Sequence, residues 1–432
     1  MNDTWLITGA RVVDPVLSRD EISDIYVENG FIRPVPERLT GKVARIEGAG
    51  LTAVPGLIDM HVHFREPGDP DAETLESGSR AASAGGFSTV LMMPNTVPPV
   101  DSSDRVLRLL EKVSGPEFAR ILPAACVTLN RGGGSLGDFP AMAKAGACAF
   151  TDDGSTVGDS RLMEQAMRKA DSLGKPVLDH ALDPSLAGRG VIREGEESKR
   201  LGLPGIPAEA EASIVERDIR LARRTGCALH VQHLSSRDSV RAVAEASDSR
   251  VSAEVTPHHV ALCDADIGSA DPDFKMNPPL GSAKDREALR AATAEGSISV
   301  FATDHAPHTP AAKGRGFVEA PFGVIGLETA VPVTYTIMVK SGLMELAQWI
   351  SRWTAGPAKV LNLPVPSLAP GAPADITFLD LQNPYTIRSS MFRSRARNTP
   401  FEGWNVTGRA VYTFRNGIML WNALEKSPGH LF

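Results

Sequence analysis

The 432-residue chain is predicted to be an α/β protein, a (β/α)8 TIM-like barrel with a small composite β domain built from both termini. Eight short apolar stretches alternate with helical patterns through the middle of the chain, which is typical of a barrel of parallel strands. Both ends of the chain have strand patterns instead. The length suits one large barrel with a smaller attached module.

The two ends are predicted to form one β domain. Residues 5–55 contain strand-like segments with a turn signal at Asn29-Gly30, and the C-terminal segment has a second such signal at Asn416-Gly417. We therefore assign residues 1–55 together with 365–432 to the small β domain, and residues 56–364 to the catalytic barrel.

The middle of the chain supplies the barrel. Its predicted strands are residues 57–64, 89–93, 121–127, 148–151, 176–180, 228–233, 251–255 and 299–304. Between them, residues 103–113 place Val106, Leu109, Leu110 and Val113 on one helical face, and residues 160–173 do the same with Met163, Ala166, Met167 and Ala170 after a Ser160 cap. An open doubly wound sheet is the alternative architecture.

Composition excludes several classes of protein. Lys plus Arg total 45 against 52 for Asp plus Glu, a net charge of −7, which argues against broad phosphate neutralisation and so against a nucleic-acid binder. The four cysteines form no CxxC pair, so neither a disulfide scaffold nor a cysteine zinc site is expected. No secretory signal and no apolar membrane span is recognised, and we expect a cytoplasmic protein.

Polar residues with metal-binding chemistry follow the predicted strands. His61 and His63 lie two residues apart at a strand end, so both imidazoles share one face and can reach one metal ion. Catalytic groups of barrels gather at the carboxyl ends of strands. Four further residues end or follow other strands: Asp153, His180, His233 and Asp304. Together the six positions exceed the needs of one tetrahedral ion and predict a site for two Zn2+ ions per subunit.

Other polar residues have a less specific pattern. Arg65 follows His63 by two residues, and its guanidinium there would suit a carboxylate substrate. Asn95 and Asn277 are read either as loop caps or as site residues, and His308 is placed at the cavity of Asp304. The remaining candidates are expected to be structural or remote: His258, His259 and His305 as structural or supporting residues, His230 in the core, His430 in the tail and Lys144 facing solvent.

Eight motifs in order resemble the dihydroorotase family, specifically its long type I form in the amidohydrolase superfamily. They are DMHVHFREPG, MMPNTVPP, FTDDG, EVTPHH, FKMNPPL, ATDHAPH, EAPFG and NTPFEGW. The resemblance runs nearly end to end. It implies a metal-dependent barrel that interconverts dihydroorotate and N-carbamoyl-aspartate in pyrimidine (UMP) synthesis. The family also implies a homodimer, and it leaves association with aspartate carbamoyltransferase open.

The resemblance also implies roles for individual residues. Metal ligation falls on His61, His63, Asp153, His180, His233 and Asp304, with Asp153 rather than the adjacent Asp152 bridging the two ions. Substrate contacts fall on His63, Arg65, Asn95, Asn277, His308 and the backbone of Phe322 and Gly323. One departure is that the family's AHCE-like run is replaced around His180 by Asp179-His180-Ala181-Leu182, which puts the tuning of that ligand in doubt.

The implied chemistry is attack of a metal-activated hydroxide on the ring amide, with Asp304 as acid and base. Two rival readings remain: another cyclic-amide hydrolase, such as an allantoinase or dihydropyrimidinase, and a non-catalytic subunit that supports aspartate carbamoyltransferase. Residues 308–322 are rich in Gly, Pro and Ala and are expected to act as a mobile lid.

Overall fold

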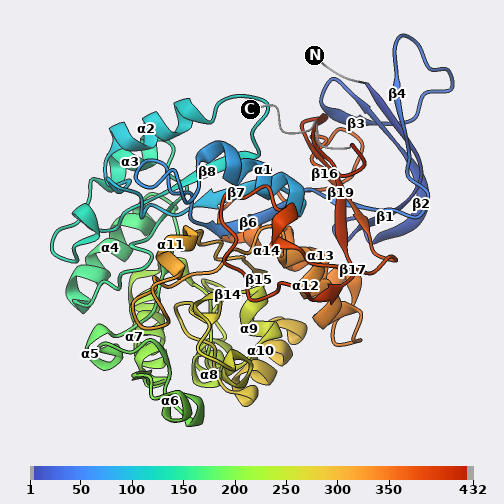
Figure 1. The fold of residues 1–432 in the computed structure, drawn as a ribbon. Coiled ribbons are helices and arrows are strands. Elements are labelled where there is room, and N and C mark those ends of the chain that lie inside the picture. The colour runs from blue at the N-terminus through green and yellow to red at the C-terminus, as the bar shows by residue number, and fades with distance from the viewer. Residues whose placement is uncertain (1–3, 426–432) are drawn as a thin grey trace.

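The computed structural model describes residues 4–425 and has two parts, a barrel ringed by helices and a mixed sheet at its side (Figure 1). The barrel strands occur in the chain order β6, β7, β8, β9, β10, β13, β14 and β15, and each is parallel to its neighbours. Their bounds are Leu57–Val62, Phe87–Met92, Arg120–Ala125, Ala149–Phe150, Val177–Asp179, Leu229–Val231, Val251–Val255 and Val300–Phe301. All eight predicted strands are confirmed. Six are shorter than predicted, β14 has the predicted bounds, and β7 begins two residues earlier and ends one residue earlier than predicted.

The sheet closes through its first and last segments. A parallel bridge joins Val62 to His305, and the His63 amide donates to the His305 carbonyl at 2.8 Å. Beneath this bridge the buried Asp59 carboxylate accepts from the Thr303 amide and hydroxyl, at 3.0 and 2.5 Å. The alternative of an open doubly wound sheet is therefore wrong.

Helices cover the outside of the barrel (Figure 1). The α-helices are α1 Leu75–Gly85, α2 Ser103–Lys112, α3 Phe139–Ala145, α4 Ser160–Ser172, α5 Pro184–Ala187, α6 Glu196–Leu201, α7 Glu209–Thr225, α8 Arg237–Ala246, α9 Pro257–Ala261, α10 Ala283–Glu295, α11 Pro310–Lys313, α12 Ala330–Thr334, α13 Leu346–Trp353 and α14 Ala355–Val360. The 3-10 turns are η1 Leu129–Arg131, η2 Asp264–Ile267, η3 Pro272–Phe274 and η5 Ser389–Met391, and η4 Tyr335–Val339 is a π-helix.

The apolar faces predicted for helices α2 and α4 point into the protein interior. Val106 and Leu109 of α2 are buried, as are all four apolar residues of the α4 stripe. The predicted cap of α4 is wrong by one residue. Asp159 is the N-cap, because its carboxylate accepts from the amides of Arg161 and Leu162, and Ser160 is the first helical residue.

Strands from both termini share one sheet. Its order is β20-β19-β16-β5-β1-β2-β3, with β4 also paired to β1. The bounds are β1 Trp5–Asp14, β2 Arg19–Glu28, β3 Phe31–Arg33, β4 Ala44–Glu47, β5 Thr52–Pro55, β16 Ile376–Asp380, β19 Arg409–Arg415 and β20 Ile418–Asn422. Two small sheets pair β11 Ile192–Arg193 with β12 Gly205–Ile206, and β17 Tyr385–Thr386 with β18 Asn405–Val406.

Both predicted hairpin turns are present in this sheet. Asn29 and Gly30 have φ values of 54° and 82°, and Asn416 and Gly417 have 48° and 74°. Two consecutive left-handed residues match the twist of the flanking strands, which explains the Asn-Gly pairs. The Trp5 indole donates to the Gly417 carbonyl at 3.0 Å and so ties the two ends of the chain together.

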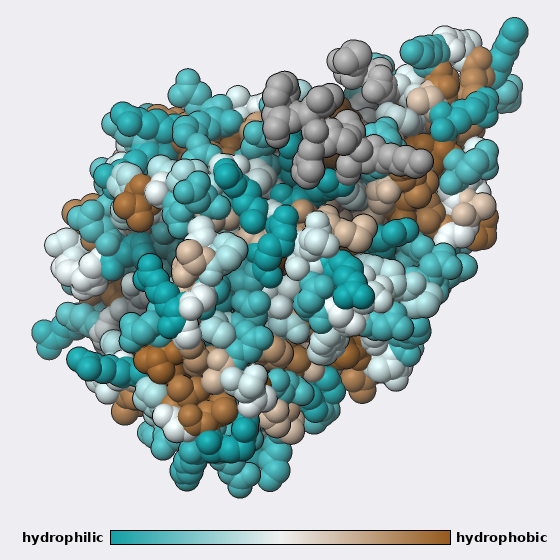
Figure 2. Space-filling view, viewed as in Figure 1, coloured by the Kyte–Doolittle hydropathy of each residue, from teal (hydrophilic) through white to brown (hydrophobic). Residues whose placement is uncertain are grey.

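The interior of the barrel is filled below its carboxyl end. Met60, Leu91, Ala124, Leu178 and Val300 come from five strands and pack in one buried cluster. On the face seen in Figure 2, hydrophilic side chains predominate, and hydrophobic ones gather in separate small groups, including one over the mixed sheet. None of the helices within residues 4–425 has the length and apolar composition needed to cross a membrane.

Candidate metal centre and active site

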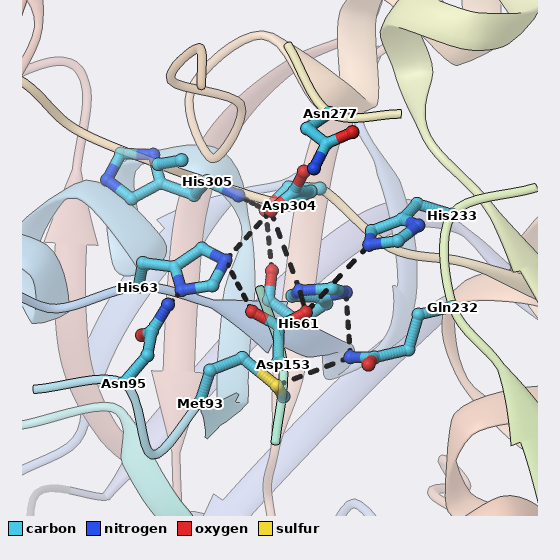
Figure 3. A network of polar contacts seen from close by, with 12 residues as sticks. His61, His63, Met93, Asn95, Asp153, Gln232, His233, Asn277, Asp304 and His305 are labelled. Atoms are coloured by element: carbon cyan, nitrogen blue, oxygen red, sulfur yellow. Dashed lines mark hydrogen bonds and ion pairs between the residues drawn. The ribbon is translucent and has the colours of Figure 1, made fainter. Parts of the chain in front are cut away.

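The six residues predicted to bind metal meet at the carboxyl end of the barrel (Figure 3 labels most of them). Each lies on a barrel strand or within three residues of its end, and each is at least 94% buried: His61, His63, Asp153, His180, His233 and Asp304. His233 and Asp304 have φ values of 33° and 48°, in the left-handed region. Such strained residues cluster at functional sites, where the surrounding fold holds them in place.

Two groups within this set have ligand atoms close enough to surround an ion. One comprises His61, Asp153 and His233, and the other His61, His63 and Asp304, with the atoms of each group within 4.8 Å of one another. His61 belongs to both groups. Its Nε2 lies 3.3 Å from Asp153 Oδ1 and 3.5 Å from Asp304 Oδ1.

Asp153 lies between the histidines. Its Oδ2 is 3.4 Å from His63 Nε2, while its Oδ1 is 3.7 Å from His180 Nδ1 and 3.8 Å from His233 Nε2. His180 falls outside both groups but contacts His233, with 2.8 Å between their ring nitrogens. The neighbouring Asp152 is bonded to Thr128 instead, so Asp153 is the aspartate that faces the histidines.

The donor set fits divalent metal ions. His61 Nδ1 lies 2.6 Å from Glu254, and His63 Nδ1 lies 2.9 Å from the side-chain oxygen of Asn95. Donation from Nδ1 leaves Nε2 of each ring to bind a metal ion. The two Nε2 atoms lie 2.9 to 3.5 Å from carboxylate oxygens of Asp153 and Asp304, so each nitrogen–oxygen pair can hold a proton or a metal ion between its atoms. Within residues 4–425, His61 Nε2 and Asp153 Oδ1 are buried without a hydrogen-bond partner. Histidine nitrogen and carboxylate oxygen are ligands that Zn2+ accepts.

The charges of the site also favour a cation. Burial alone would lower the pKa of His61, but the carboxylates of Glu254, Asp153 and Asp304 raise it well above its ordinary value. Burial would raise the pKa of Asp304, but His61 and His63 hold it below its usual range, and they do the same for Asp153. Both aspartates are therefore ionised at neutral pH.

Glu254 is a contributor that the sequence analysis missed. This fully buried carboxylate on β14 accepts from His61 Nδ1 at 2.6 Å and from the amide of His233 at 3.3 Å, and its second oxygen accepts from His230 Nε2 at 3.0 Å. His230 is buried as predicted, but it is part of this network. The available signal was a single acidic residue inside a mostly apolar strand, because a buried charge needs partners.

We expect Glu254→Gln to weaken metal binding. One amide oxygen cannot replace two carboxylate oxygens that serve His61, His230 and the His233 amide. Loss of a carboxylate that orients a metal-binding histidine typically costs about 10- to 100-fold in affinity. Zinc affinity measured by chelator competition tests this, with Asp14→Asn as the control, because Asp14 is a buried carboxylate of the mixed sheet that bonds to Leu368 and Ser367. Unchanged zinc affinity in Glu254→Gln would contradict the assignment.

The residues predicted to contact substrate line one cavity of about 220 Å³ above these groups. Its walls include His63, Arg65, Asn95, Asn277, His308, Phe322 and Gly323, together with Asp153, His180, His233 and Asp304. Arg65 Nε donates to the Pro307 carbonyl at 3.1 Å, which orients the guanidinium. The structural alternative for Arg65 is a salt bridge to Glu66, Glu73 or another local acid. Arg65 makes no ion pair within the described part of the chain, and Glu66 pairs with Lys112 and Glu73 with His305, so this alternative is wrong.

The segment predicted to be a lid forms one wall of this cavity. It contains the short helix α11 and buries Lys313, Phe317 and Ala320. His308 Nε2 donates to the Phe322 carbonyl at 2.7 Å, and burial lowers the pKa of His308 to about 3, so this imidazole is neutral. The closing motion itself stays a prediction.

The remaining candidates lie outside the metal-binding groups. His305 contacts Glu73, His259 contacts Thr256 and the Pro278 carbonyl, and the His258 ring packs on that of His259. Lys144 is exposed, as predicted. His430 lies beyond the described residues.

A closed parallel barrel with histidines and aspartates gathered at its carboxyl end is the architecture of the metal-dependent amidohydrolases. Comparison with known proteins agrees. Residues 50–239 match the family model described as dihydro-orotase-like. The chain is 44% identical over 412 residues to a dihydroorotase of Geobacillus sp. (strain WCH70), covering 94% of this chain and 96% of that protein, and 44% identical over 422 residues to one of Bacillus caldolyticus, covering 96% and 98%.

Among solved structures, the L-hydantoinase of Arthrobacter aurescens superposes with a TM-score of 0.86 at 23% identity, covering 98% of this chain and 96% of that one. The dihydropyrimidinase of Brevibacillus agri NCHU1002 gives 0.83 at 20% identity, covering 97% and 95%. These two likenesses concern the fold. The extensive identity to the bacterial relatives shows that the chain belongs to the dihydroorotase family.

Proposed function

We propose that this protein catalyses the reversible hydrolysis of (S)-dihydroorotate to N-carbamoyl-L-aspartate, the dihydroorotase step of pyrimidine biosynthesis, with two Zn2+ ions per chain. The observation that carries the proposal is the shared cavity, in which the Arg65 guanidinium lies beside the His and Asp groups and forms no ion pair within residues 4–425. A substrate that joins a cyclic amide to a carboxylate needs both features. The name of the bacterial relatives supports the same reaction.

The proposed metal ligands are His61, His63, Asp153, His180, His233 and Asp304. Asp153 has one oxygen toward His63 and the other toward His61, His180 and His233, which supports its role as the bridge between two ions. When bound, the ions would polarise the ring carbonyl and lower the pKa of water, which makes hydrolysis of an amide possible at neutral pH.

Asp304 is the proposed acid and base. Its Oδ1 faces His63 and His61, which leaves Oδ2 for a proton. In hydrolysis the carboxylate accepts a proton from the attacking water and passes it to the departing ring nitrogen, and in ring closure it takes the proton back from the carbamoyl nitrogen. The buried position keeps bulk water away from this transfer, because Asp304 is only 6% exposed.

Substrate recognition is proposed for the upper wall of the cavity. Arg65 uses Nε to bond to Pro307, so its two terminal nitrogens are available for the substrate carboxylate. Asn95 accepts from His63 and has its amide nitrogen available for the substrate, while Asn277 has a buried Oδ1 without a partner within the described residues. His308 and the backbone of Phe322 and Gly323 complete the wall.

The two alternative functions differ from this proposal in substrate: another cyclic-amide hydrolase would prefer a different ring, and a non-catalytic subunit would turn over none. A hydantoinase or dihydropyrimidinase acts on rings without a carboxylate, for which Arg65 would have no partner. A non-catalytic partner of aspartate carbamoyltransferase has no need of six intact metal-binding positions. Turnover of dihydroorotate, hydantoin and allantoin by the zinc-loaded protein tests the proposal. We expect turnover of dihydroorotate, and a preference for hydantoin or allantoin would overturn it. Homodimer formation stays a prediction for solution measurement.

We expect Arg65→Lys to keep the metal and the fold but to lose substrate recognition. Lysine retains the charge but loses the planar fork, and a hydrogen bond to a charged group is worth about 1.5–3 kcal/mol, which corresponds to roughly 10- to 100-fold in kcat/KM for dihydroorotate. Zinc content and Tm should match the wild type. An equal loss on a cyclic amide without a carboxylate would contradict this role.

A further inference from the structure

Two lysines are almost completely buried beside the proposed substrate cavity. Lys275 is 2% exposed and Lys313 is 5% exposed. Lysine is almost never buried to this degree unless it is paired with an acid. Neither forms an ion pair within residues 4–425, although Asp273 and Asp271 act on Lys313 from a greater distance. Their retention in the interior therefore needs another explanation.

Backbone carbonyls of one short segment accept the hydrogen bonds of these two ammonium groups, which a carboxylate would usually accept in a protein interior. Lys275 Nζ donates to the carbonyls of Val318 and Ala320, at 2.8 and 2.6 Å, and lies 4.5 Å from the centre of the Phe322 ring. Lys313 Nζ donates to the carbonyls of Gly323 and Pro321, at 3.0 and 3.3 Å. The two ammonium groups thus bind four carbonyls within six residues, and we call segment 318–323 the clasped segment.

The clasped segment is the wall that carries Phe322 and Gly323. The Gly323 amide donates to the Lys275 carbonyl at 2.9 Å, and the Phe322 carbonyl accepts from His308. Gly323 has a φ of 129°, and a Cβ there would come within 2.6 Å of the Ala306 Cβ, so the backbone has little room to shift. Lys275 also precedes Asn277 by two residues, so it connects two sides of the cavity.

We propose that Lys275 and Lys313 are positioning residues that hold the clasped segment in the conformation that recognises substrate. The proposal rests on the proposed function, because it assigns the effect to substrate binding at Phe322 and Gly323. A purely structural role predicts something different. If the lysines only stabilised the fold, their replacement would lower the free energy of unfolding but leave KM for dihydroorotate unchanged. Methionine would fill the same space but leave the carbonyls of Val318, Ala320 and Pro321 without these lysine donors, so the segment would move toward water to satisfy them. The Gly323 carbonyl would keep the Asn398 amide, which donates to it at 3.0 Å.

The test uses the full-length, zinc-loaded variants Lys275→Met and Lys313→Met, with Lys340→Met as the control. Lys340 is an exposed lysine whose ammonium group bonds to Thr407, in another part of the molecule. Two readouts are independent of each other. The first readout is KM and kcat for dihydroorotate, each determined from steady-state rates. The second is the rate of trypsin cleavage at the exposed Arg315, measured without substrate and identified from the fragment masses.

We expect both variants to raise KM by about tenfold or more with little change in kcat, because ground-state binding is lost while the reacting groups stay in place. Arg315 should be cut faster than in the wild type and in Lys340→Met, and zinc content should be unchanged. If the methionine variants do not fold, Lys275→Gln and Lys313→Gln, which keep a donor but no charge, should show the same changes to a smaller degree.

Unchanged KM and unchanged cleavage at Arg315 would overturn the proposal, as would a loss of zinc with a parallel fall in kcat, which would mark general damage to the site. Failure of the proposed function is distinguishable. A wild-type protein that does not turn over dihydroorotate refutes the reaction, and the cleavage rate at Arg315 then still decides whether the lysines hold the segment.

Discussion

Asp304→Asn will lower kcat for dihydroorotate by about 10²- to 10⁴-fold, the usual contribution of a general acid or base. Asparagine keeps the volume and one oxygen toward His63 but cannot accept a proton at neutral pH. The wild-type carboxylate is well suited to the task, because His61 and His63 keep it ionised and it lies in the wall of the substrate cavity. The measurement is the steady-state rate in both directions of the reaction.

Asp304 is also a proposed metal ligand, so zinc must be measured in the same sample. Full zinc content with a large fall in kcat assigns the loss to proton transfer, whereas an equal loss of zinc and activity assigns it to ligation. Asp285→Asn is the matched control, because Asp285 is a buried carboxylate that caps α10 away from the cavity. It should lower Tm without lowering kcat. Wild-type turnover in Asp304→Asn would remove the residue from the mechanism.

His61→Ala will abolish measurable activity and remove most of the bound metal. His61 is the residue that belongs to both groups of close ligand atoms, so its loss leaves each with too few donors. His63→Ala should also reduce both metal content and activity, but it affects only the group with Asp304 directly. Zinc stoichiometry and dihydroorotate turnover on the same purified protein provide the comparison.

His259→Ala is the control for removing a buried imidazole. His259 bonds to Thr256 and the Pro278 carbonyl outside the two groups, so its loss should lower stability and leave the zinc stoichiometry unchanged. Full metal content and activity in the double variant of His61 and His63 would rule out the site as described.

The fold was largely predictable because its signals are local. Apolar strands alternate with amphipathic helices, and the two Asn-Gly pairs mark hairpins through their left-handed conformation. Closure of the barrel was harder to predict from the sequence, since it depends on contacts such as that between Asp59 and Thr303, which are 244 residues apart. The domain boundaries at residues 55 and 365 stay predictions.

The proposed ligands were predictable for a related reason. Each is a histidine or aspartate at a strand end, and a barrel brings strand ends together. The supporting residues were not, because their roles depend on partners in space. Glu254 lies 193 residues from His61, and Lys275 lies 43 residues from the Val318 carbonyl that it binds. A charged residue in a buried segment signals that a partner exists without identifying it.

The measurement that tests the account most directly is a zinc titration of the metal-free protein with dihydroorotate hydrolysis followed at each addition. The His and Asp groups share His61 and are joined by Asp153, so activity should rise with bound zinc and saturate near two ions per chain. In a parallel titration, His61→Ala should show no activity at any zinc concentration. Glu254→Gln should need more zinc than the wild type to reach its full activity. Full dihydroorotate turnover by the metal-free protein, or none by the fully loaded protein, would contradict the account.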